Sequence, residues 1–180
     1  FNVLNLDPED EENGQFTNLA NIIVDNMKSP DIIGLQEIQD NSGPADNGVV
    51  SADLTLRRLA NTIRDAGGPR YRFIEIPPLD LDNGGQPGGN IRVAYLYNPK
   101  RVRFAKRKGA DATTDNAVIK GTRGPRLLFN PGYVDPENPA FAGARKPLVA
   151  EFRANGKSIF VINNHFSSKF GDDPLFGPNQ

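Results

Sequence analysis

The stretch Pro30–Asn41, PDIIGLQEIQDN, decides how the rest of the chain is interpreted. It begins with a short apolar run and turns polar at Gln36 and Glu37. This pattern is typical of a buried strand whose carboxyl end reaches solvent. We therefore predict a strand over Asp31–Glu37, with Glu37 as a candidate functional residue at its end.

The segments around this strand predict an α/β unit. Phe1–Leu6 alternates apolar residues with Asn and predicts a short strand. Apolar residues then recur at helical spacing from Phe16 to Met27, before Pro30, so a helix is expected to link two strands in a βαβ unit. A second amphipathic helix is predicted around Leu56–Ile63, with Ser51 as its cap.

The second half of the chain predicts more strands around a long irregular segment. Asn155-Gly156 is the strongest hairpin signal, because these residues accept positive φ at both turn positions. Lys106–Ala144 shows little periodicity and is expected to be one long loop, with Lys106–Lys108 as a solvated turn or, less favoured, a DNA-backbone contact. The predicted strands are Tyr71–Ile76, Ile91–Tyr97, Val102–Ala105, Leu148–Arg153 and Ser158–Asn164.

Composition excludes several classes of protein. The 180 residues carry 21 Lys and Arg against 22 Asp and Glu, a net charge of −1, so polyanion binding would need a local cluster of cations. The absence of cysteine excludes disulfides, thiolate zinc sites and cysteine nucleophiles. No apolar run approaches the roughly 20 residues that span a bilayer. The expected class is a single α/β domain.

Polar residues at predicted strand ends form the candidate site. Asn2, Glu37 and the Asn164-His165 pair each lie where a strand begins or ends. Carboxylate and amide oxygens suit Mg²⁺, Mn²⁺ or Ca²⁺, whereas one histidine and no cysteine count against zinc. Taken alone, each of these residues has a plainer interpretation, as a solvated or hydrogen-bonded strand-end side chain.

Five ordered segments carry a resemblance to a known superfamily. They are NVLNL (2–6), PDIIGLQEIQDN (30–41), GGNIRVAYLYNP (88–99), RKPLVAEF (145–152) and NNHFSSK (163–169). Together they resemble the endonuclease/exonuclease/phosphatase superfamily, and most closely its bacterial secreted nucleases. The resemblance implies a deoxyribonuclease-like two-sheet α/β sandwich and a secreted or periplasmic location.

The resemblance also implies roles for individual residues. Glu37 would be the metal-binding carboxylate, and Asn2 would assist at the metal and the scissile phosphate. Arg145 would contact phosphate, and His165 would act on the leaving-group side as a catalytic residue. Substrate-binding positions would be Asn90, Arg92 and Asn164, in addition to Arg145. The implied cofactor is a divalent cation, with Mg²⁺ the first choice.

The resemblance implies that residues 1–180 form only the N-terminal portion of such a domain. The superfamily's GDxN and SDH segments, which position and activate the attacking water, have no counterpart here. We therefore expect a metal-dependent phosphodiester hydrolase acting on DNA or RNA, whose missing C-terminal half is itself a partner. Residues 1–180 alone are expected to bind metal weakly and to hydrolyse nothing at a useful rate.

Two other functions stay open at this point. The first is a phosphomonoesterase or a phosphatase of inositol phosphates or phospholipids, which a closed pocket would favour. A basic groove built from Arg92, Arg123, Arg126 and Tyr133 would favour a polymer instead. The second is a catalytically silent module that binds polyanions without metal.

Overall fold

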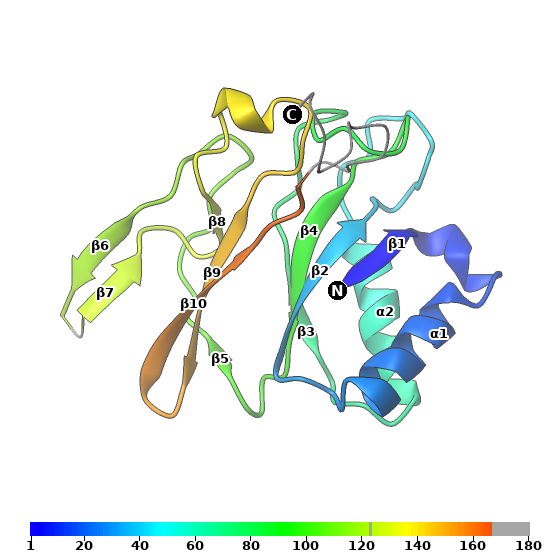
Figure 1. The fold of residues 1–180 in the computed structure, drawn as a ribbon, viewed down its shortest axis with the longest axis horizontal. Helices are drawn as coiled ribbons and strands as arrows, with labels where there is room; N and C mark the ends of the chain where they lie inside the picture. The colour runs from blue at the N-terminus through cyan, green and yellow to red at the C-terminus, as the bar shows by residue number, and fades with distance from the viewer. Residues whose placement is uncertain (123, 167–180) are drawn as a thin grey trace, which may run out of the picture.

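The structure is a computed structural model and describes residues 1–122 and 124–166. Its first sheet has the strand order β1-β2-β4-β3 (Figure 1). β1 runs parallel to β2, and the other neighbours are antiparallel. The strands are β1 (Asn2–Leu6), β2 (Ile32–Ile38), β3 (Arg72–Ile74) and β4 (Arg92–Tyr97), in agreement with the predicted positions.

Helices cover one face of this sheet, as Figure 1 shows. After a short 3-10 turn, η1 (Pro8–Glu11), helix α1 (Gln15–Asn21) continues into a π-helical turn, η2 (Ile22–Asn26), and so occupies the predicted helical segment. It links the parallel strands β1 and β2, as the predicted βαβ unit requires. None of the helices in the described ranges is long and apolar enough to cross a membrane.

Helix α2 (Asp53–Asp65) corrects the predicted cap. Ser51 Oγ accepts only a long 3.4 Å hydrogen bond from Asp53 N. The backbone N–H groups of the first turn, which have no partner within the helix, bond instead to Asn41. Its Oδ1 accepts a hydrogen bond from Leu54 N at 2.9 Å. Asn41 lies in the loop after β2, so the helix start is fixed by a tertiary contact that local sequence signals do not reveal.

The second sheet is built on the predicted hairpin. β9 (Leu148–Ala154) pairs antiparallel with β10 (Lys157–Asn163), and Asn155 and Gly156 have φ of 49° and 77°, as the Asn-Gly turn requires. Two short strands, β5 (Arg103–Phe104) and β8 (Gly132–Tyr133), also pair with β9.

The first sheet lies between two hydrophobic cores. One core joins β1, β2 and β4 to the helices, through residues such as Val3, Leu35 and Leu59. The other joins the two sheets, through residues that include Tyr95 and Phe152. The molecule is therefore a mixed α/β structure with helices, first sheet and second sheet in successive layers (Figure 1).

The segment Lys106–Ala144 is not the single loop that its weak periodicity predicts. It contains a two-stranded ribbon, β6 (Val118–Gly121) and β7 (Gly124–Leu127), then β8 and a 3-10 turn, η3 (Pro139–Phe141). The ribbon projects from the second sheet at the left of Figure 1. Most residues of these two strands are exposed. The strands therefore lack the buried apolar face that makes a strand recognisable in a sequence.

Candidate functional site

Four predicted site residues from four separate segments lie in contact. Asn2 opens β1, Glu37 lies near the end of β2, Arg145 precedes β9, and His165 follows β10. Asn2 Nδ2 donates to Glu37 Oε1 at 2.7 Å, and Glu37 Oε1 lies 3.4 Å from His165 Nε2. Arg145 Nε donates to His165 Nδ1 at 3.2 Å. We call these four residues the strand-end cluster.

A bulge in β2 directs Glu37 into the cluster. The three steps from Leu35 to Ile38 face only two steps of β4, from Ala94 to Arg92. Glu37 itself has a φ of 65°, in the left-handed region that non-glycine residues rarely adopt. Such conformations cost about 1–3 kcal/mol and persist where surrounding contacts enforce them. The bulge therefore turns the Glu37 side chain away from the regular alternation of the strand.

β1 bulges at the same level and supplies hydrogen bonds to Glu37. Leu4 and Asn5 both have positive φ, at 58° and 51°. Asn5 N donates to Glu37 Oε2 at 3.2 Å, and Leu4 N donates to Asn2 Oδ1 at 2.8 Å. Both Glu37 oxygens thus accept hydrogen bonds from β1, so the carboxylate is held in one orientation.

The hydrogen bond from Arg145 determines the proton position on His165. A guanidinium N–H can only donate, so His165 Nδ1 accepts and a neutral imidazole carries its proton on Nε2, toward Glu37. Burial lowers the pKa of His165, the nearby Arg145 lowers it further, and Glu37 opposes both. The pKa of Arg145 is also lowered, by burial, against the charge of Glu37.

A buried amide places the end of β10 over the bulge in β2. Asn163 Nδ2 donates to Leu35 O at 2.9 Å and to Ala94 O at 3.0 Å. Asn163 Oδ1 accepts from Gln36 Nε2 at 2.6 Å. Asn163 therefore joins the two sheets two residues before His165. Neither Asn163 nor Gln36 is predicted as a site residue from the sequence, although both lie within the quoted segments.

Two predicted substrate-binding residues lie in the interior. Arg92 is fully buried, paired with Glu75 at 3.2 Å and bonded to the carbonyl of Asn90 at 2.6 Å. Asn90 is 2 % exposed; its Oδ1 accepts from Leu81 N, and its Nδ2 donates to Val49 O. Because these groups are already bonded within the protein, neither residue presents a surface to a substrate here.

The remaining predicted positions have mixed outcomes. Asn164 is exposed beside the strand-end cluster. In the groove predicted from Arg92, Arg123, Arg126 and Tyr133, Arg92 and Tyr133 are buried, which removes them from any groove surface. Arg126 is exposed on β7. Arg123 and residues 167–169 of the NNHFSSK segment lie outside the described residues.

The strand-end cluster offers a divalent cation one partly exposed carboxylate. Mg²⁺ is commonly bound through one or two carboxylates and keeps several waters, and Glu37 offers one carboxylate that is 20 % exposed. Asn2 orients that carboxylate through its Nδ2, while its Oδ1 is bonded to Leu4 N. Within the described ranges, no three His, Asp or Glu residues form a group that could hold a metal by themselves.

Comparisons with known proteins add no relative. No family model matches the chain, and neither a curated protein nor a solved structure matches it.

Proposed function

We propose that this chain carries the metal- and phosphate-binding part of a phosphodiester hydrolase that acts on nucleic acid. The observation that supports this proposal is the contact between Asn2, Glu37, His165 and Arg145, which come from four distant segments. The carboxylate of Glu37, the neutral imidazole of His165 and the guanidinium of Arg145 then lie side by side at the strand ends, where sites in layered α/β proteins gather. The proposed fold is the deoxyribonuclease-like sandwich.

Each side chain has a defined part in this proposal. Glu37 would hold the divalent cation, which when bound neutralises charge on the phosphoryl oxygens. Arg145 would contact the phosphate, since its two described hydrogen bonds leave further guanidinium N–H donors. His165 would donate a hydrogen bond from Nε2 to the leaving oxygen as water adds to phosphorus and the P–O ester bond breaks, while the proton released by the attacking water passes through solvent to that leaving oxygen.

The chain contains a single histidine, so one imidazole would have to serve the leaving group and the attacking water. Arg145 fixes that imidazole with its proton-bearing nitrogen toward Glu37. We therefore propose that these residues bind and polarise the ester better than they activate water. Slow hydrolysis by residues 1–180 is the expected result.

Metal binding to Glu37 is the direct test. We expect calorimetry to detect weak Mg²⁺ or Mn²⁺ binding and Glu37→Gln to weaken it by about tenfold or more, because the only carboxylate of the cluster is lost. The matched control is Glu137→Gln, an exposed carboxylate on the loop before η3, and it should leave metal affinity unchanged. Equal metal affinity in all three proteins would contradict the proposal.

Plasmid nicking gives a second readout. Any nicking by the chain should require Mg²⁺, stop with EDTA and be lost in Glu37→Gln but not in Glu137→Gln. Hydrolysis of a small phosphomonoester but not of plasmid DNA would replace nucleic acid with a small ester as the substrate. Nucleic-acid binding in EDTA that is weakened by Arg145→Gln, without any metal-dependent cleavage by the chain, would favour a silent polyanion-binding module at the strand-end cluster.

A further inference from the structure

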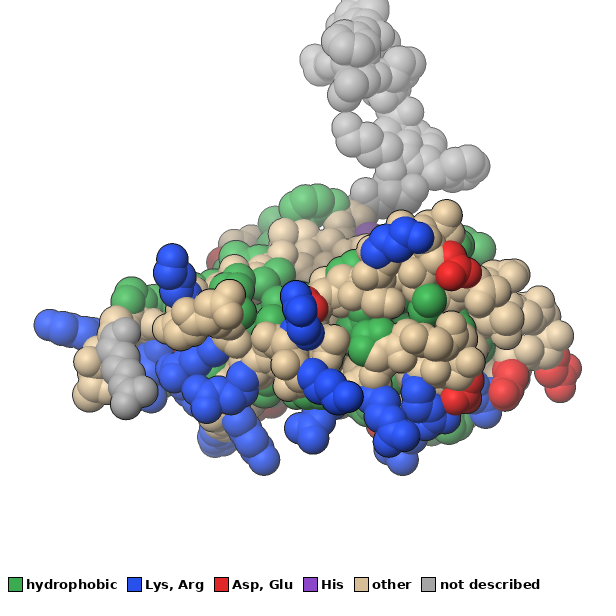
Figure 2. Space-filling model, turned by 90° about the horizontal axis from the view of Figure 1, so that it is seen from below, with side chains coloured by type: hydrophobic (Ala, Val, Ile, Leu, Met, Phe, Trp, Pro, Cys, Tyr) green, Lys and Arg blue, Asp and Glu red, His purple; other side chains and the backbone are tan. Residues whose placement is uncertain are grey.

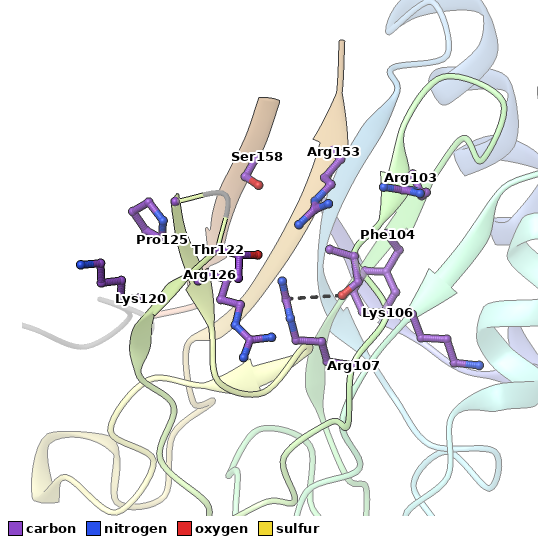
Figure 3. A pocket seen from close by; sticks show the side chains of 13 residues that line it. Arg103, Phe104, Lys106, Arg107, Lys120, Thr122, Pro125, Arg126, Arg153 and Ser158 are labelled. Carbon is purple, nitrogen blue, oxygen red and sulfur yellow. Dashed lines mark hydrogen bonds between the residues drawn. The ribbon is translucent and has the colours of Figure 1, made fainter. Parts of the chain in front are cut away.

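A second charged region lies away from the strand-end cluster, between the β6–β7 ribbon and the second sheet. Here a cavity of about 780 Å³ is lined by residues from the β5 region, both ribbon strands, β9 and β10 (Figure 3). Its cationic side chains are those of Arg103, Lys106, Arg107, Lys120, Arg126 and Arg153. We call this cavity the basic cleft.

The hairpin β9–β10 separates the basic cleft from the strand-end cluster. Ser158 lines the cleft near the amino end of β10, whereas Asn163 ends the strand two residues before His165. Five residues of extended strand span about 16 Å. A ligand in the cleft therefore occupies a surface of its own.

The basic cleft has a large excess of positive charge. Its lining includes no acidic residue. The one carboxylate beneath it is the fully buried Glu151, which pairs with Arg107 at 2.8 Å and lies 3.7 Å from Arg153 Nε. Among the described residues, no ion pair is formed by the other four cations, Arg103, Lys106, Lys120 and Arg126.

This excess is local and is not a property of the whole chain. Six of the 21 Lys and Arg residues surround one cavity in a chain whose net charge is −1. Figure 2 shows Lys and Arg side chains along the lower edge of the view, several of them at the left, which is the end that carries β6 and β7. Like charges held together repel one another unless an anion joins them.

The arrangement fits several phosphates better than one. Figure 3 shows arginines from β5, β7, β9 and the segment after β5 around the cavity, with the side chains of Lys106 and Lys120 extending outward at its rim, so a single small anion cannot reach them all. Four of the six are arginines, whose planar guanidinium can donate two hydrogen bonds to one phosphate. A flexible chain of phosphates is the ligand that would use them together.

An exposed aromatic ring narrows the ligand class to nucleic acid. Phe160 is 41 % exposed and lines an adjoining cavity together with Arg103 and Arg153. Unpaired bases stack on such rings beside a cationic groove, and this is the recurring pattern of single-strand binding. A sulfated polysaccharide has no aromatic base to stack on Phe160, and a flat lipid surface does not enter a cavity.

We infer that the basic cleft is a second binding site, which takes a single-stranded segment of nucleic acid. Its backbone phosphates lie against the unpaired arginines and lysines, and a base stacks on Phe160. The site needs no metal and no residue of the strand-end cluster, so the inference goes beyond the proposed function and stands or falls separately from it.

Binding of a fluorescent 15-nucleotide oligothymidylate in EDTA tests the inference. The double variant Arg103→Gln/Arg126→Gln should lower affinity by about tenfold or more, and should reduce the slope of log K against log salt by about 1.4, because two phosphate contacts are lost. The charge-matched control is Arg57→Gln/Arg64→Gln on α2, whose exposed arginines pair with Asp53 and Asp65. It should keep the wild-type affinity and slope.

Phe160→Ala tests the aromatic part of the inference. We expect a further loss of about tenfold in oligothymidylate affinity without a change in the salt slope, because stacking and not charge is removed. Equal losses in the two arginine double variants would overturn the site. Unchanged affinity in Phe160→Ala, or heparin or anionic vesicles binding more tightly than the oligonucleotide, would overturn its assignment to nucleic acid.

Discussion

The strand-end cluster and the basic cleft lie at opposite ends of the β9–β10 hairpin. They differ in how far their charged side chains are buried and paired. In the cluster, Glu37 and His165 are only 20 % and 16 % exposed, and each contacts a group from another segment. In the cleft, Arg103 and Arg126 are exposed and form no ion pair with any described residue.

This difference follows from the cost of burial. A charge removed from water must be paired and hydrogen-bonded, so the half-buried side chains of the cluster contact one another. Exposed cations keep their hydration and can stay unpaired until a ligand arrives. The cluster is therefore built to hold groups in fixed positions, and the cleft is built to attract a flexible polyanion.

The largest expected effect comes from the one buried carboxylate beneath the cleft. Glu151 accepts hydrogen bonds from Arg107 at 2.8 Å, Ser158 at 2.9 Å and Leu127 N at 3.2 Å. Glu151→Ala should lower the free energy of unfolding by about 3–5 kcal/mol, because it leaves a half-buried arginine and a buried amide without their partner. Urea unfolding measures this, and Glu137→Ala is the exposed control, with a change within about 0.5 kcal/mol.

Asn163→Ala should act on the strand-end cluster and spare the cleft. Leu35 O and Ala94 O lose the amide that joins the sheets, so stability should fall by about 1–3 kcal/mol. Metal affinity should fall as well, because β10 no longer holds His165 beside Glu37. Its exposed neighbour gives the control for stability, since Asn164→Ala removes no hydrogen bond within the described residues. Unchanged metal affinity in a clearly destabilised Asn163→Ala would contradict the positioning role.

The sequence predicts those structural features whose causes lie in neighbouring residues. The parallel pair β1–β2, the first helix and the Asn-Gly hairpin are all predicted, because periodicity and turn chemistry are local signals. The resemblance selected Asn2, Glu37, Arg145 and His165, and the fold brings these four together.

The features that sequence reasoning missed depend on distant partners. Arg92 lies in an apolar run, and only the fold shows that Glu75 and backbone carbonyls bury it. The cap of α2 comes from Asn41, a dozen residues before the helix start. The cleft's cations are spread from Arg103 to Arg153, so only the packing of the β6–β7 ribbon beside β9 gathers them.

Acid should destabilise the floor of the basic cleft through Glu151. Burial acts to raise the pKa of Glu151, but hydrogen bonds from Arg107, Ser158 and Leu127 N outweigh it, and the net pKa is lowered. As pH falls, the carboxyl of Glu151 is therefore protonated at a higher pH in the unfolded state than in the folded state. Its contribution to the free energy of unfolding is full above the ordinary glutamate pKa and is lost as pH falls through the lowered value. Unfolding measured from pH 6 to pH 3 should show a shallower loss in Glu151→Gln than in the wild type, and an equal loss would contradict this.

The smallest expected effect is that of a single methyl group between the sheets. A Cβ at Gly34 would lie 3.1 Å from Asn163 Cγ and 3.2 Å from its Oδ1 and Nδ2, so the amide must move by a few tenths of an ångström. Displacing a side chain that is bonded on both sides costs about 0.5–1.5 kcal/mol, while Gly→Ala restricts the unfolded chain and returns about 0.4–1 kcal/mol. Gly34→Ala should therefore change stability little and still weaken metal binding, because Asn163 sets the position of His165. Oligothymidylate affinity at the basic cleft should stay at the wild-type value, and a parallel loss there would mean that the two regions are coupled through β10.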